Sequence, residues 1–138
     1  MTAPAPPPTH RDRIAVVTGA AQGIGQAVSR QLAARGATVV AVERNEPAET
    51  CALIEEAGHP VVGLRADVAD PDQTARVGEQ VRSRFGRCHI LVNNAGIYPF
   101  RTIDDLDYAT WRRVLAVNLD SYFVTGQTIM ADGGLVRL

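Results

Sequence analysis

Three glycines near the start of the chain have a spacing that could hold phosphate groups. Gly19, Gly23 and Gly25 form the pattern G-x-x-x-G-x-G. The apolar run Ile14 to Val17 precedes them and predicts a strand, and apolar residues four apart follow them and predict a helix. In such a unit the first glycine permits a tight turn, the second lets the backbone approach a pyrophosphate, and the third packs helix against strand. The pattern predicts a dinucleotide site, with an empty glycine-rich turn as the alternative.

A carboxylate and a guanidinium follow the second predicted strand, which covers residues 37–42. Glu43 lies 18 residues beyond Gly25, near the place where a carboxylate binds the adenosine ribose of NAD. The same carboxylate would repel the additional phosphate of NADP, whereas the neighbouring Arg44 could bind it. These two residues favour NAD as the cofactor and keep NADP as the alternative.

An acidic and an apolar residue, Asp67 and Val68, follow the third predicted strand. The carboxylate could accept a hydrogen bond from the adenine amine, and the valine could form the floor beneath the ring. Alternatively, Asp67 could cap the helix that begins near Pro71. The residues alone leave both roles open.

The elements that must position these groups alternate regularly between strand and helix. Such alternation predicts an α/β fold in which a Rossmann-like parallel sheet lies between two layers of helices, with the strand order 3-2-1-4. The first helix starts at the glycine turn, the third runs from about Pro71 to Gly86, and the fourth covers 107–122. The predicted strands are 14–18, 37–42, 61–66 and 89–93.

Two motifs together resemble the short-chain dehydrogenase/reductase family. Thr18, Gln22 and Ile24 complete the glycine turn as T-G-x-x-x-G-I-G, and the fourth predicted strand leads into N-N-A-G at residues 93–96. The resemblance implies reversible hydride transfer between a nicotinamide cofactor and an alcohol or carbonyl compound. It also places Asn94, Ala95 and Gly96 beside the cofactor, supports the adenine role of Asp67, and makes Asn118 the asparagine that holds a water in the proton relay.

The resemblance stops after the fourth predicted helix. Residues 13–123 resemble the first half of such an enzyme, and residues 124–134 resemble its end, where a last strand closes with D-G-G. This implies that the catalytic Ser, the Tyr-x-x-x-Lys pair and the substrate loops between them are absent. All fourteen basic residues are arginine, so no lysine ammonium can lower the pKa of a tyrosine hydroxyl. A fifth strand at 128–131 is predicted to pair with the exposed edge of the fourth.

Two other groups could replace the absent catalytic pair. Tyr108 and Arg112 lie one helical turn apart, and a fixed cation lowers the pKa of a phenol, but their segment is not the catalytic helix of the family. Ser121 and Tyr122 have no cation four residues on and are the weaker candidates. An exposed surface pair is the favoured interpretation of Tyr108 and Arg112.

Composition excludes several other classes of protein. A net charge of −1 gives no electrostatic reason to expect nucleic acid or an anionic membrane as a partner. Two separated cysteines favour reduced thiols in the cytoplasm, three scattered histidines show no metal-ligand spacing, and neither a membrane span nor a signal-peptide core is evident. Residues 1–10 contain four prolines and predict a flexible arm, followed by one domain over 11–138.

Three functions compete at this point. The chain could be a remnant that binds a nicotinamide dinucleotide without turning over a substrate. It could be an active oxidoreductase that uses Asn118, water or residues of a partner chain. It could also be an interaction piece, such as a shortened isoform, that associates through the 107–122 helix or the open strand edge. The abrupt join also fits an incorrect gene model or a partial sequence.

Overall fold

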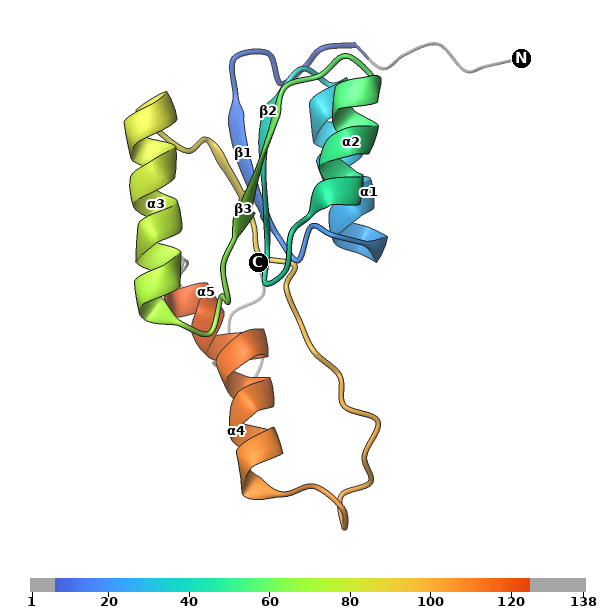
Figure 1. Ribbon diagram of the computed structural model, residues 1–138, viewed down its shortest axis with the longest axis vertical. Helices are drawn as coiled ribbons and strands as arrows, with labels where there is room; N and C mark the ends of the chain where they lie inside the picture. The colour runs from blue at the N-terminus through green and yellow to red at the C-terminus, as the bar shows by residue number, and fades with distance from the viewer. Residues whose placement is uncertain (1–6, 125–138) are drawn as a thin grey trace, which may run out of the picture.

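A four-stranded parallel sheet lies between two layers of helices in the computed structural model, which describes residues 7–124 (Figure 1). The strand order is β3-β2-β1-β4, as predicted. The helices α1 and α2 cover one face, and α3 covers the other. The elements are β1 (Ile14–Thr18), α1 (Gly23–Ala34), β2 (Thr38–Glu43), α2 (Ala48–Glu56), β3 (Val61–Arg65), α3 (Pro71–Phe85), β4 (Ile90–Val92), α4 (Tyr108–Leu115), a π-helical turn η1 (Ala116–Asp120) and α5 (Ser121–Val124).

The two central strands are buried on both faces, which explains their unbroken apolar sequences. Val17, Val39 and Val40 are fully buried, with 0% of each residue exposed. Val16, Val40 and Val42 pack toward α3, whereas Val17, Val39 and Ala41 pack toward α1 and α2. Each fully buried valine stabilises the fold by roughly 1.5–3 kcal/mol relative to an exposed one. Burial therefore fixes the register of the strands whose ends carry the predicted site residues.

The third helix has well-defined ends. Its N-cap is Asp70, whose carboxylate accepts hydrogen bonds from the backbone N–H groups of Asp72 and Gln73, at 2.9 and 3.2 Å. Gly86 ends the helix with a φ of +77°, a left-handed conformation that glycine adopts without strain. Asp67, which was considered as the cap from the sequence, lies three residues earlier and does not cap this helix.

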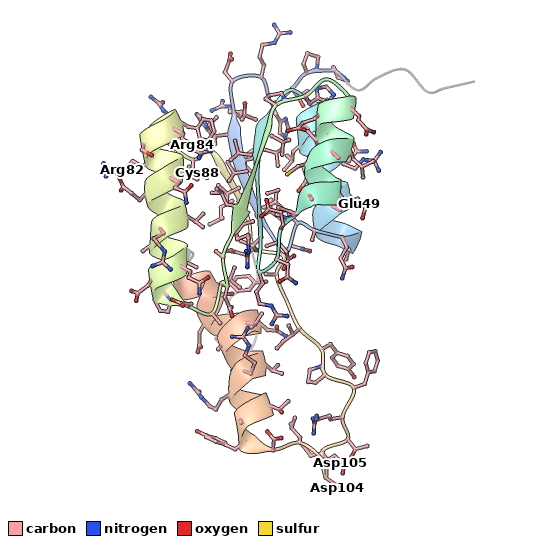
Figure 2. The ribbon with its side chains drawn as sticks, in the orientation of Figure 1. Glu49, Arg82, Arg84, Cys88, Asp104 and Asp105 are labelled. Carbon is pink, nitrogen blue, oxygen red and sulfur yellow. The ribbon has the colours of Figure 1, made fainter. Side chains whose placement is uncertain are left out.

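Charged side chains lie on the outer surfaces of the helices (Figure 2). Arg82 on α3 and Glu49 on α2 point away from the sheet. Arg82 forms an exposed ion pair with Glu79, at 2.6 Å. Such a surface pair contributes at most about 1 kcal/mol to stability, so the apolar contacts with the sheet hold α3 in place.

The helices α4, η1 and α5 continue one another beyond the carboxyl ends of the strands (Figure 1). Asp107 caps α4 by accepting from the N–H of Thr110, at 2.6 Å. No residue of α4 is buried, and Trp111 is 47% exposed. This segment therefore packs less tightly than the rest of the fold.

The predictions for the two ends of the chain, an arm at 1–10 and a strand at 128–131, fall partly or wholly outside the described residues. The predicted strand at 128–131 lies outside it, and within residues 7–124 the strand β4 pairs with β1 alone. Of the predicted arm 1–10, only residues 7–10 are described, and there the N–H of His10 donates to the carbonyl of Arg35 at 2.8 Å.

Candidate functional site

A cleft of about 550 Å³ lies at the carboxyl ends of the strands. This is where open parallel sheets bind ligands, because the loops leaving adjacent strands diverge there. The cleft brings together every predicted cofactor residue except Thr18 and Gly25. Those that line it are Gly19, Gln22, Gly23, Ile24, Glu43, Arg44, Asp67, Val68, Asn94, Ala95 and Gly96.

The three glycines of the turn have different surroundings. A Cβ on Gly19 would lie 2.8 Å from the Cα of Ala95, and one on Gly25 would collide with the carbonyl oxygen of Gly19. Both positions therefore require glycine for internal packing. Gly23 has a φ of +56° and no atom within 4 Å of where its Cβ would lie. The space beside Gly23 is thus open to the cleft.

The first turn of α1 has no side-chain cap. Gln22 occupies the N-cap position in an extended conformation and makes no capping hydrogen bond. The N–H groups of a helix start and its partial positive charge attract anions, above all phosphate. Gln22, Gly23 and Ile24 line the cleft at this point. The uncapped turn and the open space at Gly23 together form a cradle suited to a pyrophosphate.

The side chains of Thr18 and Asn94 each form hydrogen bonds with the backbone around the other residue, and these bonds hold the glycine turn against the end of β4. The Thr18 hydroxyl accepts from the N–H groups of Asn94 and Ala95, both at 3.1 Å. The Asn94 amide donates to the carbonyls of Thr18 and Gly19, also at 3.1 Å. Thr18 is only 3% exposed. The two sequence motifs therefore meet as a hydrogen-bonded connection between the ends of β1 and β4.

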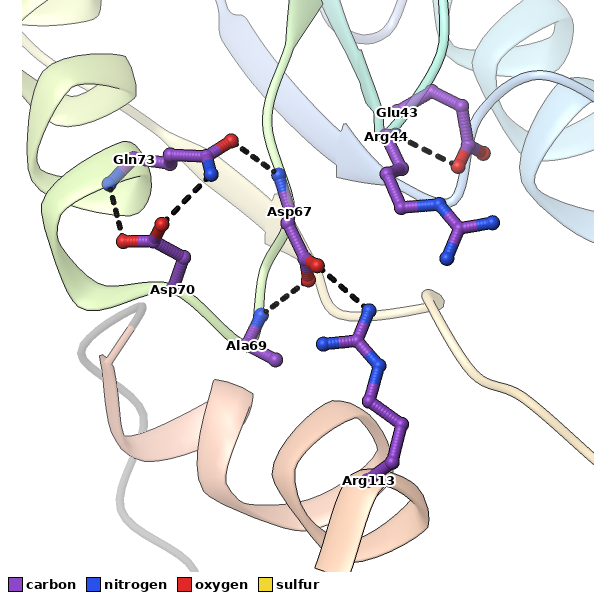
Figure 3. Close-up of polar contacts among 7 residues, drawn as sticks. All are labelled: Glu43, Arg44, Asp67, Ala69, Asp70, Gln73 and Arg113. Atoms are coloured by element: carbon purple, nitrogen blue, oxygen red, sulfur yellow. Dashed lines mark hydrogen bonds and ion pairs between the residues drawn. The ribbon is translucent and has the colours of Figure 1, made fainter. Parts of the chain in front are cut away.

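Glu43 turns its carboxylate toward the glycine turn. One carboxylate oxygen accepts from the N–H of Ala21 at 3.4 Å, and the other accepts from the N–H of Arg44 at 2.8 Å (Figure 3). Both Glu43 and Arg44 line the cleft. An acidic group and a basic group thus stand side by side at the end of β2.

Asp67 forms an ion pair with Arg113 of α4 (Figure 3). The Arg113 Nη2 donates to Oδ2 of Asp67 at 2.6 Å, and Oδ1 accepts from the N–H of Ala69 at 2.9 Å. Burial opposes ionisation of Asp67, but the hydrogen bonds from Arg113 and Ala69 and the positive charges of Arg113 and Arg44 outweigh it, so the pKa of this carboxyl lies below its ordinary value. Asp67 therefore enters the cleft as an ionised acceptor.

Asn118 lies on the π-helical turn η1 and outside the lining of the cleft. Its amide oxygen accepts from the N–H of Ile97 at 2.8 Å, and its amide nitrogen donates to the Ile97 carbonyl at 2.9 Å. Both ends of this side chain are therefore used to hold the loop that follows N-N-A-G against the helix.

The alternative catalytic candidates are not gathered in the cleft. Tyr108 is 76% exposed at the start of α4 and does not line the cleft, and neither does Arg112. The Tyr122 hydroxyl donates to the carbonyl of Asn93 at 3.1 Å, and the Ser121 hydroxyl donates to the carbonyl of Val117 at 2.6 Å. Among the described residues, no group of three histidine, cysteine or acidic side chains could hold a metal ion.

Several residues that line the cleft were not predicted from the sequence. Arg113 and Val117 are four residues apart, so they share the face of the helical segment that meets the cleft. The spacing of these two residues can be read from the sequence, but the position of their helix relative to the end of β3 cannot. The others are residues next to predicted ones in the chain: Ala21, Val42, Asn45, Ala66 and Ile97.

Comparison with known proteins gives a consistent result. A model of the short chain dehydrogenase family matches residues 13–133. The chain is 42% identical over 118 residues to cis-4-hydroxycyclohexanecarboxylate dehydrogenase of Sinomonas cyclohexanicum, an alignment that covers 84% of this chain and 47% of the relative. The chain thus spans about half the length of the curated relatives it matches.

Solved structures show the same fold. A protein described as a short-chain alcohol dehydrogenase from Sinorhizobium meliloti has 39% identity and a TM-score of 0.80, over 87% of this chain and 48% of that one. A protein described as an NAD(P)-dependent gluconate 5-dehydrogenase from Beutenbergia cavernae, with NADP bound at low occupancy, has 37% identity and a TM-score of 0.77, over 87% of this chain and 48% of that one. With its two motifs joined at the end of the sheet, this chain belongs to the short-chain dehydrogenase family, a family of oxidoreductases with an NAD(P)-binding fold.

Proposed function

We propose that this chain binds a nicotinamide dinucleotide, preferably NAD, in the cleft at the carboxyl ends of its strands. The observation that carries the proposal is the open space at Gly23 beside the uncapped start of α1. A pyrophosphate there would receive backbone N–H donors and the positive end of the helix dipole. Gly19, Gln22, Ile24 and Gly25 complete this cradle.

The preference for NAD rests on the end of β2. Glu43 would accept hydrogen bonds from the hydroxyls of the adenosine ribose, and its negative charge would repel a phosphate attached to that ribose. Arg44 opposes this preference because a guanidinium binds phosphate well. Glu43 has its carboxylate fixed by two backbone N–H groups, which supports the choice of NAD.

The adenine and nicotinamide ends of the ligand would lie against different parts of the cleft. Asp67 and Val68, at the end of β3, would contact the adenine. Asn94, Ala95 and Gly96, after β4, would bring the backbone close to the rest of the dinucleotide, and Thr18 would support them from behind. When bound, the nicotinamide supplies or accepts a hydride.

We further propose that binding is not followed by turnover through the usual route of the family. No lysine occurs in the sequence, so no ammonium can lower a tyrosine pKa, and the amide of Asn118 is already bonded to Ile97 at both ends. The chain would then hold its dinucleotide as a binding protein.

A calorimetric titration with NAD and with NADP tests the binding proposal. The Gly23→Ala variant places a methyl group where the pyrophosphate would lie and should weaken NAD binding at least about tenfold, which corresponds to about 1.4 kcal/mol. The control is Gly58→Ala, because Gly58 also has a positive φ of +79° and nothing within 4 Å, yet lies outside the cleft. The Gly58→Ala variant also places alanine at a positive φ, so it carries a similar backbone strain, and it should leave the affinity for NAD unchanged. Binding that survives equally in both variants would place the cofactor elsewhere.

Self-association is a second candidate property, favoured by the exposed apolar side chains around α4. Phe100 is 95%, Ile103 81% and Trp111 47% exposed. Such residues are typical of association surfaces when they are contiguous. Sedimentation of the purified chain over a range of concentrations should show a larger species, and Trp111→Ser should shift it toward the monomer. A monomer at every concentration would remove this candidate and leave the binding proposal intact. No helix in the described part has both the length and the hydrophobicity needed to cross a membrane.

A further inference from the structure

A buried threonine of α2 forms hydrogen bonds with the glycine turn but does not line the cleft. Thr50 is 0% exposed. Its hydroxyl donates to the carbonyl of Ala20 at 2.7 Å and lies 3.2 Å from the carbonyl of Ala21, so its one proton is shared between them. The side-chain amide of Gln26, on α1, donates to the same hydroxyl at 3.1 Å and to the Ala21 carbonyl at 3.2 Å. Side chains from two helices therefore hold the middle of the glycine turn.

The burial of a hydroxyl at this position is explained by the turn. Thr50 lies four residues before Ile54, on the buried face of α2, where Ile54 is 1% exposed. An aliphatic side chain is the ordinary occupant of such a face, because a buried hydroxyl costs free energy unless it is hydrogen-bonded. The described bonds of the Thr50 hydroxyl all run to the turn or to Gln26. The contact with the turn is thus what satisfies this polar group.

The two bonded carbonyls determine where the N–H groups after them point. In a trans peptide unit, the C=O and the N–H of the next residue point in opposite directions. Because the Ala20 carbonyl is held toward Thr50, the N–H of Ala21 points the other way. That N–H donates to Glu43, a residue of the cleft, at 3.4 Å. By the same geometry, the bonded carbonyl of Ala21 turns the N–H of Gln22 away from the partners of that carbonyl.

The next N–H groups belong to the start of α1. The first backbone hydrogen bond of this helix runs from the N–H of Gln26 to the carbonyl of Gln22, at 3.2 Å. The N–H groups of Gly23, Ile24 and Gly25 precede that bond and have no acceptor inside the helix. Their position in the cleft depends on the turn from which the helix starts, and Thr50 holds that turn.

We propose that Thr50 is a positioning residue of the pyrophosphate cradle, because its hydroxyl holds two carbonyls of the turn so that the following N–H groups face the phosphates. This inference rests on the proposed function and adds a residue of α2 to it. Thr50 touches no ligand atom, and Gln26 assists it by bonding both the hydroxyl and the Ala21 carbonyl. Donors that are held in place bind an anion more tightly, because binding does not have to order them.

Two variants separate the hydroxyl from the shape of the side chain. Thr50→Val keeps the branched shape and removes the hydroxyl that bonds the carbonyl of Ala20, whereas Thr50→Ser keeps the hydroxyl and loses a methyl group. In a calorimetric titration of the whole chain, Thr50→Val should weaken NAD binding about tenfold, as expected for the loss of one buried hydrogen bond. Thr50→Ser should restore the affinity to within about threefold of the unmodified chain, which is under 1 kcal/mol by the same relation.

A second ligand shows whether the effect of Thr50→Val is confined to the cradle. Adenosine has no pyrophosphate, so its affinity should change by less than about twofold, which is roughly 0.4 kcal/mol. A general loosening of the fold would instead weaken adenosine and NAD by the same factor. The ratio of the two affinities therefore reports on positioning and not on stability.

The matched control is Thr74→Val, at the start of α3. The Thr74 hydroxyl also lies within hydrogen-bond distance of two backbone carbonyls, those of Asp70 and Pro71, at 3.3 and 2.9 Å, and Thr74 does not line the cleft. The same chemical change there should leave the affinity for NAD unchanged. Incomplete folding of any variant lowers the stoichiometry of binding and so is distinguished from a loss of affinity.

The outcomes separate this inference from the proposed function. The inference is overturned, and the proposed function stands, if Thr50→Val binds NAD as tightly as the unmodified chain or if Thr50→Ser loses as much affinity as Thr50→Val. An equal loss for adenosine and NAD in Thr50→Val, or an equal loss of NAD affinity in Thr74→Val, also overturns it. An unmodified chain that binds neither NAD nor NADP overturns the proposed function and this inference with it.

Discussion

The glycine turn and the α4 segment differ in how completely they are held by the rest of the chain. Around the turn, Thr18 is 3% exposed, and its hydroxyl accepts hydrogen bonds from the backbone N–H groups of Asn94 and Ala95. On α4 no residue is buried. Hydrogen bonds from Arg113 to Asp67, between Asn118 and Ile97, and from Tyr122 to Asn93 connect α4 and the helical turns after it to the loops at the strand ends. The glycine turn is thus held by its own contacts at the ends of β1 and β4, whereas α4 leaves much of its apolar surface exposed.

This difference shows which part of the cleft depends only on local sequence. A turn and the two strands beside it supply their own hydrogen-bond partners, because adjacent parallel strands end at the same edge. A helix that must cover the edge of a sheet needs further elements on its outer side. We expect substitutions in the two regions to differ accordingly in their effect on stability.

The largest effect is expected at Gly25. Gly25→Ala places a Cβ against the carbonyl oxygen of Gly19, and neither backbone can move without breaking the connection to Asn94. The expected loss is about 3 kcal/mol of unfolding free energy, at the upper end for an overpacked site. Urea unfolding measures it. The control Gly78→Ala, on α3 with nothing within 4 Å, should instead stabilise the protein by roughly 0.5–1 kcal/mol. If Gly25→Ala and Gly78→Ala changed the unfolding free energy equally, the glycine turn would not be tightly packed.

A smaller loss is expected when the hydroxyl of Thr18 is removed. Thr18→Val keeps the shape of the side chain but leaves the N–H groups of Asn94 and Ala95 without their acceptor. An unsatisfied buried donor costs about 1–3 kcal/mol, so a loss of about 2 kcal/mol is expected.

The matched control for this change lies in the exposed loop before α4. Thr102 donates to the carboxylate of Asp105 at 2.8 Å, where water can replace the bond. Thr102→Val should therefore change the unfolding free energy by less than about 0.5 kcal/mol. A loss at Thr102 as large as that at Thr18 would contradict the contrast between the two regions.

The smallest effect is expected for the ion pair that joins α4 to the residues after β3. The pKa of Asp67 in the folded chain lies below its ordinary value of 3.8, so its ionisation stabilises the fold above that pH and ceases to do so as the pH falls through the folded value. Because Arg113 is more than a third exposed, solvent screens the pair, and the contribution should be below about 1 kcal/mol.

The comparison of the unmodified chain with Asp67→Asn isolates this contribution. The difference in unfolding free energy between the two proteins should be constant near neutral pH and shrink below about pH 4, where the carboxyl of the unmodified chain also becomes neutral. If the difference grew as the pH fell, the pKa of Asp67 would be raised in the folded chain, which would contradict the lowered pKa.

Much of the architecture could be predicted because it depends on local signals. The strand predicted at 14–18 has the same bounds as β1. Pro71 and Gly86 marked the ends of α3, since proline suits a first helical turn and glycine a left-handed cap. The prediction of β4 was less accurate, because 89–93 shortens to Ile90–Val92. Its bounds depend on pairing with β1, which a single run of residues does not contain. Asp67 was considered as a cap of α3 from the sequence, and the structure was needed to show that Asp70 is the cap.

By itself the sequence determined the family, the order of the strands and the glycine cradle, because each depends on residues close together in the chain or on a repeated strand–helix alternation. Only the tertiary structure decided that Asn118 holds the backbone of Ile97 and that Arg113 meets Asp67. Asp67 and Arg113 are 46 residues apart in the chain. Their contact depends on where α4 lies against the end of β3, and helical spacing fixes the face that a side chain occupies but not the neighbour which that face meets.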